Sequence, residues 1–186
     1  QVTAGTLVLS KNFPKIETIN DYLLIAYAGG ASDAQVLKKI IAAELKLKHL
    51  KSKKRPTVKE GANLTATVSF RTIRQPSMIP SIVGSLIAGY DEDGSCSLFT
   101  IEPAGSIMKV EDYDANFSSG MPFMLGVLEK GYKKSISVND GIKLAIDCIK
   151  ASTQRDVGSG YGLDVWTITK DGVKQVLKQK IESIYK

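Results

Sequence analysis

The chain has 186 residues, a formal net charge of +6, and 43% hydrophobic and 24% charged residues. These values are ordinary for a soluble globular protein and suit one compact domain over residues 1–186. No run approaches the ~20 consecutive apolar residues that span a bilayer, so the sequence predicts no membrane segment and no membrane partner.

Strand-like patterns occur in three groups along the chain. Apolar or alternating runs predict strands at residues 5–10, 22–28, 81–90, 97–101, 106–110, 163–169 and 173–177. Turn chemistry joins two pairs of them into hairpins, DEDGS at residues 91–95 and Asp171–Gly172.

Helix signals lie between these groups. Ser32 and Gln35 have the spacing of a capping box, and Pro56 ends the helix that follows. Apolar residues at helical spacing predict its core-facing side: Val36, Ile40, Ala43, Leu47 and Leu50. Thr57 and Glu60 form a second capping box for a helix to about residue 74. Two more helices are expected, from Pro122 to about residue 130 and from a cap at Ser137.

The order of these elements predicts the fold class. Strand runs joined by hairpins alternate with pairs of helices, which favours α+β layers over βαβ winding. Two sheets, each covered on one face by a helix pair, would bury all the apolar stripes. The sequence contains no evident internal repeat and no domain linker.

The cysteines and the histidine exclude several kinds of site. Cys96 and Cys148 form no Cys-x-x-Cys pair and no disulfide framework, which argues against a zinc site and favours a reducing, cytoplasmic location. The single histidine, His49, lies among lysines, far from the setting that a Ser-His-Asp or Cys-His triad needs. A hydrolase with this sequence would use another base, and we expect no metal and no cofactor.

A basic segment runs from residue 38 to residue 59. It holds eight lysines and one arginine against one acid, Glu44, for a charge of +8. Such a patch is compatible with nucleic acid, but no aromatic residues are interleaved with the lysines as a stacking surface requires. A solvated helix end, or a face that meets an acidic partner subunit, is the preferred interpretation, and nucleic acid is not expected as a partner.

Several motifs together resemble the beta subunit of the proteasome core particle. They are GGASDAQVL at residues 29–37, LIAGYD at 86–91, NFSSGMPFMLGVLE at 116–129 and QRDVGSGYGLDV at 154–165. They occur in the family's order and cover essentially the whole chain, in a form that resembles the archaeal proteins. The resemblance implies a four-layer αββα sandwich, the N-terminal-nucleophile hydrolase fold, with two antiparallel sheets packed face to face.

The resemblance also implies a nucleophile that lies before Gln1. In the family, an N-terminal threonine exposed by self-cleavage begins a hairpin, and QVTAGTLVLSK at residues 1–11 resembles the segment after that hairpin. About 10–20 residues would precede Gln1. A threonine hydroxyl needs an adjacent base, and a free α-amine with a pKa near ~8 can serve as one without any histidine.

The resemblance assigns roles to individual residues. The catalytic group comprises Lys15, Gly29, Ser119, Asp156 and Ser159, and the substrate-binding group comprises Thr3, Tyr27, Gly29 and Ala31. Lys15 would lie beside the nucleophile, and Gly29 would supply the oxyanion-hole N–H. Asp156 and Ser159 would position the amine, with Ser119 near it. Substrate would bind as an added strand, which suits unfolded chains of any sequence.

Three positions depart from the family pattern. Tyr27 would make the specificity pocket shallow, whereas Phe117 and Met121 stand where small residues are common. The leading hypothesis is a threonine-type endopeptidase. The alternative is a structural beta subunit that assembles in the same way without turnover.

Partners follow from the same resemblance. It implies a seven-membered ring of beta subunits, stacked on a second such ring and flanked by rings of alpha subunits. Unfolded proteins would be the substrates, and a regulatory ATPase would act only indirectly through the alpha ring.

Overall fold

The computed structural model describes residues 1–115 and 117–180, which form two compact units. Among the described residues, the smaller unit comprises 1–15, 112–167 and 174–180. The larger unit comprises 16–111 and 168–173. Each unit combines helices with antiparallel strands, as expected for the α+β class. The single domain expected over residues 1–186 stays a prediction.

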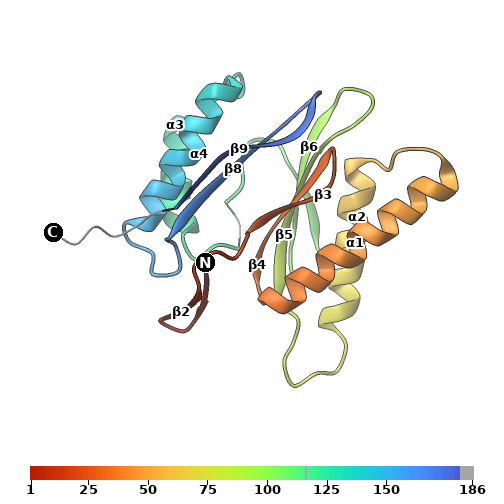
Figure 1. The fold of residues 1–186 in the computed structure, drawn as a ribbon, viewed down its shortest axis with the longest axis horizontal. Helices are drawn as coiled ribbons and strands as arrows, with labels where there is room; N and C mark the ends of the chain where they lie inside the picture. Colours follow the sequence, from red (N-terminus) through yellow and green to blue (C-terminus); the bar gives the residue numbers. More distant parts are fainter. Residues whose placement is uncertain (116, 181–186) are drawn as a thin grey trace. The chain divides into compact units, whose positions relative to one another are not determined.

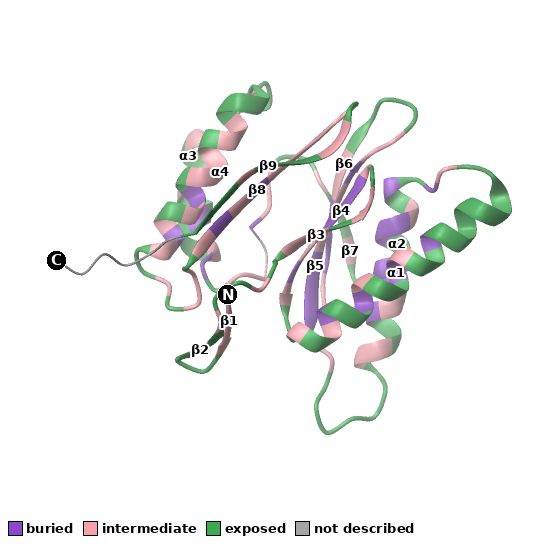
Figure 2. Cartoon of the chain, in the orientation of Figure 1, coloured by how far each residue is buried: buried purple, intermediate pink, exposed green. Residues whose placement is uncertain are grey.

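The larger unit is built on a five-stranded antiparallel sheet in the order β3-β4-β5-β6-β7 (Figure 1). Its strands are β3 (Ile16–Asn20), β4 (Leu23–Gly29), β5 (Val83–Tyr90), β6 (Cys96–Ile101) and β7 (Ile107–Val110). Helices α1 (Ala31–Ser52) and α2 (Val58–Ile73) lie against the sheet, with α1 on β4 and α2 on β5 and β6. Buried residues gather on β4, β5 and parts of both helices (Figure 2), where Ile25 and Ile87 are fully buried. Strand β3 has no counterpart among the predicted strands.

Helix α1 differs from the sequence prediction at its start and on its faces. The capping box at Ser32 is wrong: the N-cap is Gly30, with no side-chain cap, and Ser32 lies inside the helix. The predicted core stripe is also wrong, because Val36, Ile40, Leu47 and Leu50 are exposed. The buried side carries four other residues: Ala34, Leu37, Ile41 and Leu45. Both rows have helical spacing, so periodicity alone does not choose between them.

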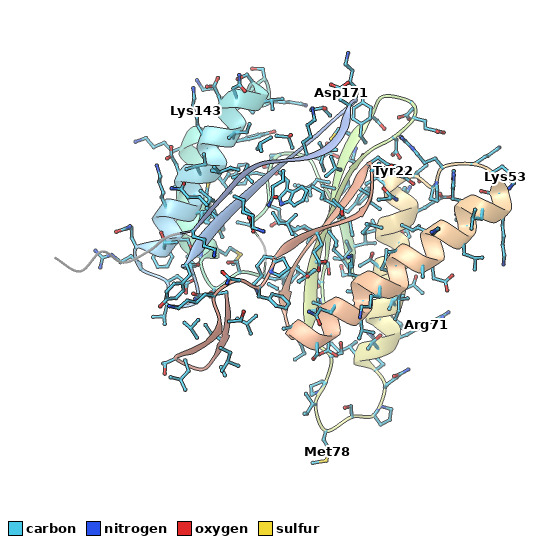
Figure 3. The ribbon with its side chains drawn as sticks, in the orientation of Figure 1. Tyr22, Lys53, Arg71, Met78, Lys143 and Asp171 are labelled. Carbon is cyan, nitrogen blue, oxygen red and sulfur yellow. The ribbon has the colours of Figure 1, made fainter. Side chains whose placement is uncertain are left out.

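The other local signals of the larger unit are confirmed. Thr57 and Glu60 form a reciprocal capping box at the start of α2. The DEDGS turn joins β5 to β6, and Asp91 accepts a hydrogen bond from the Val58 N–H at 2.9 Å. Lys53, in the left-handed conformation, ends α1 (Figure 3). The lysines near this end are exposed, as expected for a solvated helix end.

The smaller unit pairs two helices and contains a short hairpin. Residues 5–10 were expected to form one strand, but β1 (Val2–Ala4) and β2 (Leu7–Ser10) are antiparallel strands that meet at Gly5, which has a φ of +58°. Helices α3 (Met121–Gly131) and α4 (Val138–Thr153) pack together around Ala115, Met124 and Cys148. As expected, the Ser137 side chain caps α4.

A final hairpin is formed by β8 (Gly162–Thr169) and β9 (Gly172–Lys180), close to the predicted ranges. Leu163 and Val165 are its buried residues. Within the parts of the chain that the structure describes, no helix has both the length and the apolar character to cross a membrane.

Candidate active site

A cluster of serine side chains surrounds one carboxylate in the smaller unit. Asp156 follows the end of α4, and its Oδ2 accepts hydrogen bonds from Ser119 Oγ at 2.8 Å and from Ser159 Oγ at 2.5 Å. Its Oδ1 accepts the Gly158 N–H at 3.0 Å. Ser119 lies in the loop before α3, so two segments distant in sequence meet at this carboxylate.

The hydrogen bonds hold Asp156 in its ionised form. Partial burial alone would raise the pKa of this carboxyl, but the donors from Ser159, Ser119 and Gly158 outweigh it, so the pKa is lowered. Asp156 is therefore a carboxylate at neutral pH and can act only as an acceptor.

A third hydroxyl extends the cluster. Ser152, near the end of α4, is 1% exposed, and its Oγ lies 2.6 Å from Ser159 Oγ. Sequence reasoning missed Ser152, because a serine in the last turn of a predicted helix is common and carries no functional signal.

Two glycines make room for these side chains. A Cβ at Gly120 would lie 1.9 Å from Ser152 Oγ, and a Cβ at Gly158 would lie 2.4 Å from Ser119 Oγ. Real Cβ atoms do not approach other atoms so closely. The absence of side chains at 120 and 158 is therefore a condition for this cluster.

The Lys15 side chain belongs to the same unit but lies outside this hydrogen-bonded network. Its Nζ is 5.7 Å from the ring centroid of Phe13, and partial desolvation lowers the pKa of Lys15. Among residues 1–115 and 117–180, no hydrogen bond or ion pair joins Lys15 to Ser119, Asp156 or Ser159. The structure thus brings together three of the five predicted catalytic residues.

The glycine-rich loop after Asp156 also holds the first hairpin. Gln1 Nε2 donates to the Val157 carbonyl at 3.0 Å, and the Lys11 Nζ lies 4.5 Å from the ring centroid of Tyr161. Thr3, expected to bind substrate, pairs with Val8 next to an irregularity in the β1–β2 register.

Two aromatic residues near the cluster have a left-handed backbone. Phe117 has a φ of +62° and Tyr161 a φ of +61°. Such values are uncommon for bulky residues and cost about 1–3 kcal/mol each. Phe117 lies two residues before Ser119, at a position where the resemblance leads one to expect a small residue.

Gly29 and Ala31 lie in the larger unit, at the junction of β4 and α1. Gly29 has a φ of +122°, and a Cβ there would lie 2.1 Å from the Ile82 carbonyl oxygen. The next N–H, of Gly30, donates to that same oxygen at 3.1 Å. Only glycine suits position 29, and this requirement comes from the pairing of β4 with β5.

Tyr27, also in the larger unit, belongs to a chain of polar contacts. It is 5% exposed, and its hydroxyl donates to Glu17, whose other oxygen lies 3.0 Å from Lys38 Nζ. Burial and the bond to Glu17 raise the pKa of Tyr27 well above its usual value. The sequence prediction missed Glu17 because it missed β3, and it placed Lys38 only in the general basic segment.

Within the described residues, no group of three or more histidine, cysteine, aspartate or glutamate side chains could hold a metal ion. The cluster itself offers hydroxyl groups and one ionised carboxylate. Such a set can orient a cationic or hydrogen-donating group placed against it.

Comparison with known proteins identifies a family. The sequence profile of the family described as "Proteasome subunit" matches residues 1–168. "Proteasome subunit beta" of Nanoarchaeum equitans is 38% identical over 176 residues, which cover 95% of this chain and 87% of the relative. "Proteasome subunit beta 1" of Thermococcus onnurineus is 36% identical over 186 residues, covering 100% and 88%. The protein of the same name from Hyperthermus butylicus is 35% identical over 184 residues, covering 99% and 86%.

Proposed function

Because the chain belongs to the proteasome subunit family, we propose that it is a catalytic beta subunit of the 20S core particle, a threonine-type endopeptidase. The family has the αββα sandwich fold of the N-terminal-nucleophile hydrolases, so the expected fold class is confirmed. The chain assembles with other proteasome subunits.

The observation that carries the proposal is the cluster of Ser119 and Ser159 around Asp156. In the proposed mechanism, the mature chain begins with a threonine that precedes Gln1. The free α-amine of this threonine takes the proton from its own hydroxyl, which attacks the peptide carbonyl. Asp156 and Ser159 accept hydrogen bonds from the amine and fix its direction, while Ser119 donates to the same Asp156 oxygen as Ser159 and helps to hold the carboxylate in place.

The remaining roles are proposed on the resemblance and are compatible with the geometry of each unit. Lys15 lies beside the nucleophile, where a cationic ammonium lowers the pKa of the amine. The Gly29 N–H stabilises the oxyanion, and Thr3 with Ala31 pairs the substrate backbone as an added strand. Tyr27, fixed by Glu17, forms a shallow floor to the specificity pocket and favours small side chains.

The finer account of assembly and location is part of the proposal. Seven beta subunits form a ring that stacks on a second ring, and alpha rings flank the pair. The particle acts in the cytoplasm on unfolded proteins, and a regulatory ATPase reaches it only through the alpha ring. Enclosure restricts cleavage to chains that can enter.

One observation favours the non-catalytic alternative. Phe117 is a bulky residue with a left-handed backbone two positions before Ser119, where the family commonly has a small residue. A loop altered in this way is expected of a subunit that has only a role in assembly. In that case the subunit folds and assembles in the same way without turnover.

The test uses the native protein assembled with its alpha partner. N-terminal sequencing or intact mass shows whether a free threonine begins the mature chain, and mass analysis after incubation with a β-lactone shows whether this threonine reacts. We expect a leading threonine and a single labelled site. A mature chain without threonine, or without label, establishes the structural alternative.

A pair of variants then tests the cluster. Asp156→Asn is expected to lower peptidase activity by about 100-fold or more, because the amine that acts as the general base loses the acceptor that directs it. Asp93→Asn is the matched control, because the Asp93 carboxylate also accepts hydrogen bonds, from the Ser95 N–H and hydroxyl, but lies in the β5–β6 turn. Equal activities of the two variants would remove Asp156 from the mechanism.

A further inference from the structure

Ser152 has a single side-chain partner in the described part of the chain. The residue is 1% exposed, and its Oγ lies 2.6 Å from Ser159 Oγ. The Ser152 carbonyl, in turn, accepts the Asp156 N–H at 2.9 Å. Since buried hydroxyls are almost always hydrogen bonded, the bond to Ser159 is the one that satisfies this side chain.

The protons in this network can have only one order. Asp156 is ionised and has no proton to donate, so the Ser159 proton lies on the 2.5 Å bond from Ser159 to Asp156. A hydroxyl has one proton. Ser152 must therefore be the donor to Ser159, and the sequence of bonds runs from Ser152 through Ser159 to Asp156.

This order leaves Ser159 with one free lone pair. Its oxygen accepts from Ser152 with one of two lone pairs, and its proton is committed to Asp156. Because the proton and one lone pair of Ser159 are fixed by these two bonds, the direction of its second lone pair is fixed as well. Each bond in such a chain also strengthens the next.

The Ser152 hydroxyl lies in close contact with the backbone at the start of α3. It fills the space beside Gly120, where an added Cβ would lie 1.9 Å from Ser152 Oγ and 3.0 Å from Ser159 Oγ. Gly120 is the N-cap of α3, so the end of one helix and the start of the other confine the hydroxyl pair.

We propose that Ser152 is a positioning residue for the peptidase reaction: its hydroxyl donates to Ser159 and so directs the free lone pair of Ser159 at the nucleophile's amine. The effect on catalysis rests on the proposed function, because the free lone pair of Ser159 matters for the reaction only if it accepts a hydrogen bond from the nucleophile's amine. The positioning of Ser159 is a separate physical claim that holds or fails without any turnover.

The experiment compares Ser152→Ala with Ser69→Ala in the assembled particle. Ser69 is the matched control: it is a buried serine on α2, 8% exposed, whose hydroxyl has no partner among the described residues. Steady-state hydrolysis of a fluorogenic peptide gives kcat and KM separately. A crystal structure of the Ser152→Ala particle gives the position of Ser159 Oγ.

We expect Ser152→Ala to lower kcat about tenfold, as for one ordinary hydrogen bond. KM should stay within about twofold, because Ser152 does not touch the substrate, and Ser69→Ala should match the wild type. Ser159 Oγ should leave its place beside Asp156.

Two results would overturn the proposal. They are an unchanged kcat in Ser152→Ala, or a Ser159 hydroxyl that keeps its position in the variant. A wild-type particle in which this subunit neither reacts with β-lactone nor cleaves peptide overturns the proposed function instead, and the crystal structure then decides the positioning claim alone.

Discussion

Alanine at position 120 should destabilise the chain by colliding with Ser152. Gly120 has a φ of −81°, so the backbone accepts alanine and only space opposes it. The new methyl would lie 1.9 Å from Ser152 Oγ, which must leave its bond to Ser159. Overpacking costs about 1–3 kcal/mol and the lost hydrogen bond about 1 kcal/mol, so we expect Gly120→Ala to cost roughly 2–4 kcal/mol.

The double variant separates this collision from any general effect of the substitution. Ser152→Ala alone should cost about 1 kcal/mol, the worth of its hydrogen bond. In that background the hydroxyl is gone, and the closest contacts of the new methyl are the residue 152 Cβ and Ser159 Oγ, both at 3.0 Å, a distance that small shifts relieve. The double variant should therefore be more stable than the sum of the single costs predicts, by about 1–2 kcal/mol.

Urea unfolding provides the measurement. The chain has one tryptophan, Trp166 in β8, so its fluorescence reports on the unit that contains the cluster. Four proteins complete the cycle: the wild type, the two single variants and the double variant. Additivity within about 0.5 kcal/mol would show that residues 120 and 152 are not in contact and would refute the packing described here.

Three further predictions concern other single substitutions. Gly29→Ala should lower the free energy of unfolding by about 3 kcal/mol or more, because position 29 has a φ of +122° and a Cβ there would lie 2.1 Å from the Ile82 carbonyl oxygen. Gly126→Ala is the control in the same unfolding assay: a Cβ at position 126 has no other atom within 4 Å, so this variant should be as stable as the wild type or more stable. Asp156→Asn should change the pH dependence of stability. Because the folded state lowers the pKa of Asp156, this carboxylate contributes stability that is fully present above the unfolded pKa near ~3.9 and is lost as pH falls through the folded pKa. The difference in free energy of unfolding between the wild type and the variant should therefore shrink in acid. A difference that stays constant from about pH 2 to 6 would contradict this. Thr57→Ala should cost about 1 kcal/mol by removing the capping box, and an unchanged midpoint of urea unfolding would show that the cap does not stabilise α2.

Local signals account for the parts of the fold that the sequence predicted well. The capping box at Thr57, the cap at Ser137 and the DEDGS turn each involve residues at most four apart, and all three are present. The chemistry that fixes such features is contained in the residues themselves.

Features that depend on distant partners were missed or misplaced. Residues Ile16–Asn20 form β3 because they pair with β4. The five residues include the charged Glu17, so their alternation of apolar and polar residues is too short to predict a strand. In α1, the sheet selects the row with Leu37 and Ile41 for burial, although the exposed row through Val36 and Ile40 has equally regular spacing. The tertiary contact, not the period, decides which side of this helix is buried.

The candidate site shows the same division. No local pattern connects Ser119 with Asp156, which are 37 residues apart, and only the family resemblance named them together. That resemblance could not name Ser152 or Glu17, because their roles arise from contacts of this chain: a hydroxyl confined beside Gly120 and a carboxylate under Tyr27.

The distribution of donors on Asp156 bears on whether the cluster serves the fold alone. A loop brace needs little more than the bond from the Gly158 N–H to Oδ1, which closes the turn by itself. Both serine hydroxyls converge instead on Oδ2, and in the described residues Oδ1 keeps a second lone pair open. An ionised carboxylate with one open acceptor position suits a neighbouring amine. If the cluster only braces the loop, the activity of Asp156→Asn should fall in proportion to its stability; if it holds the nucleophile's amine, activity should fall far more than stability does.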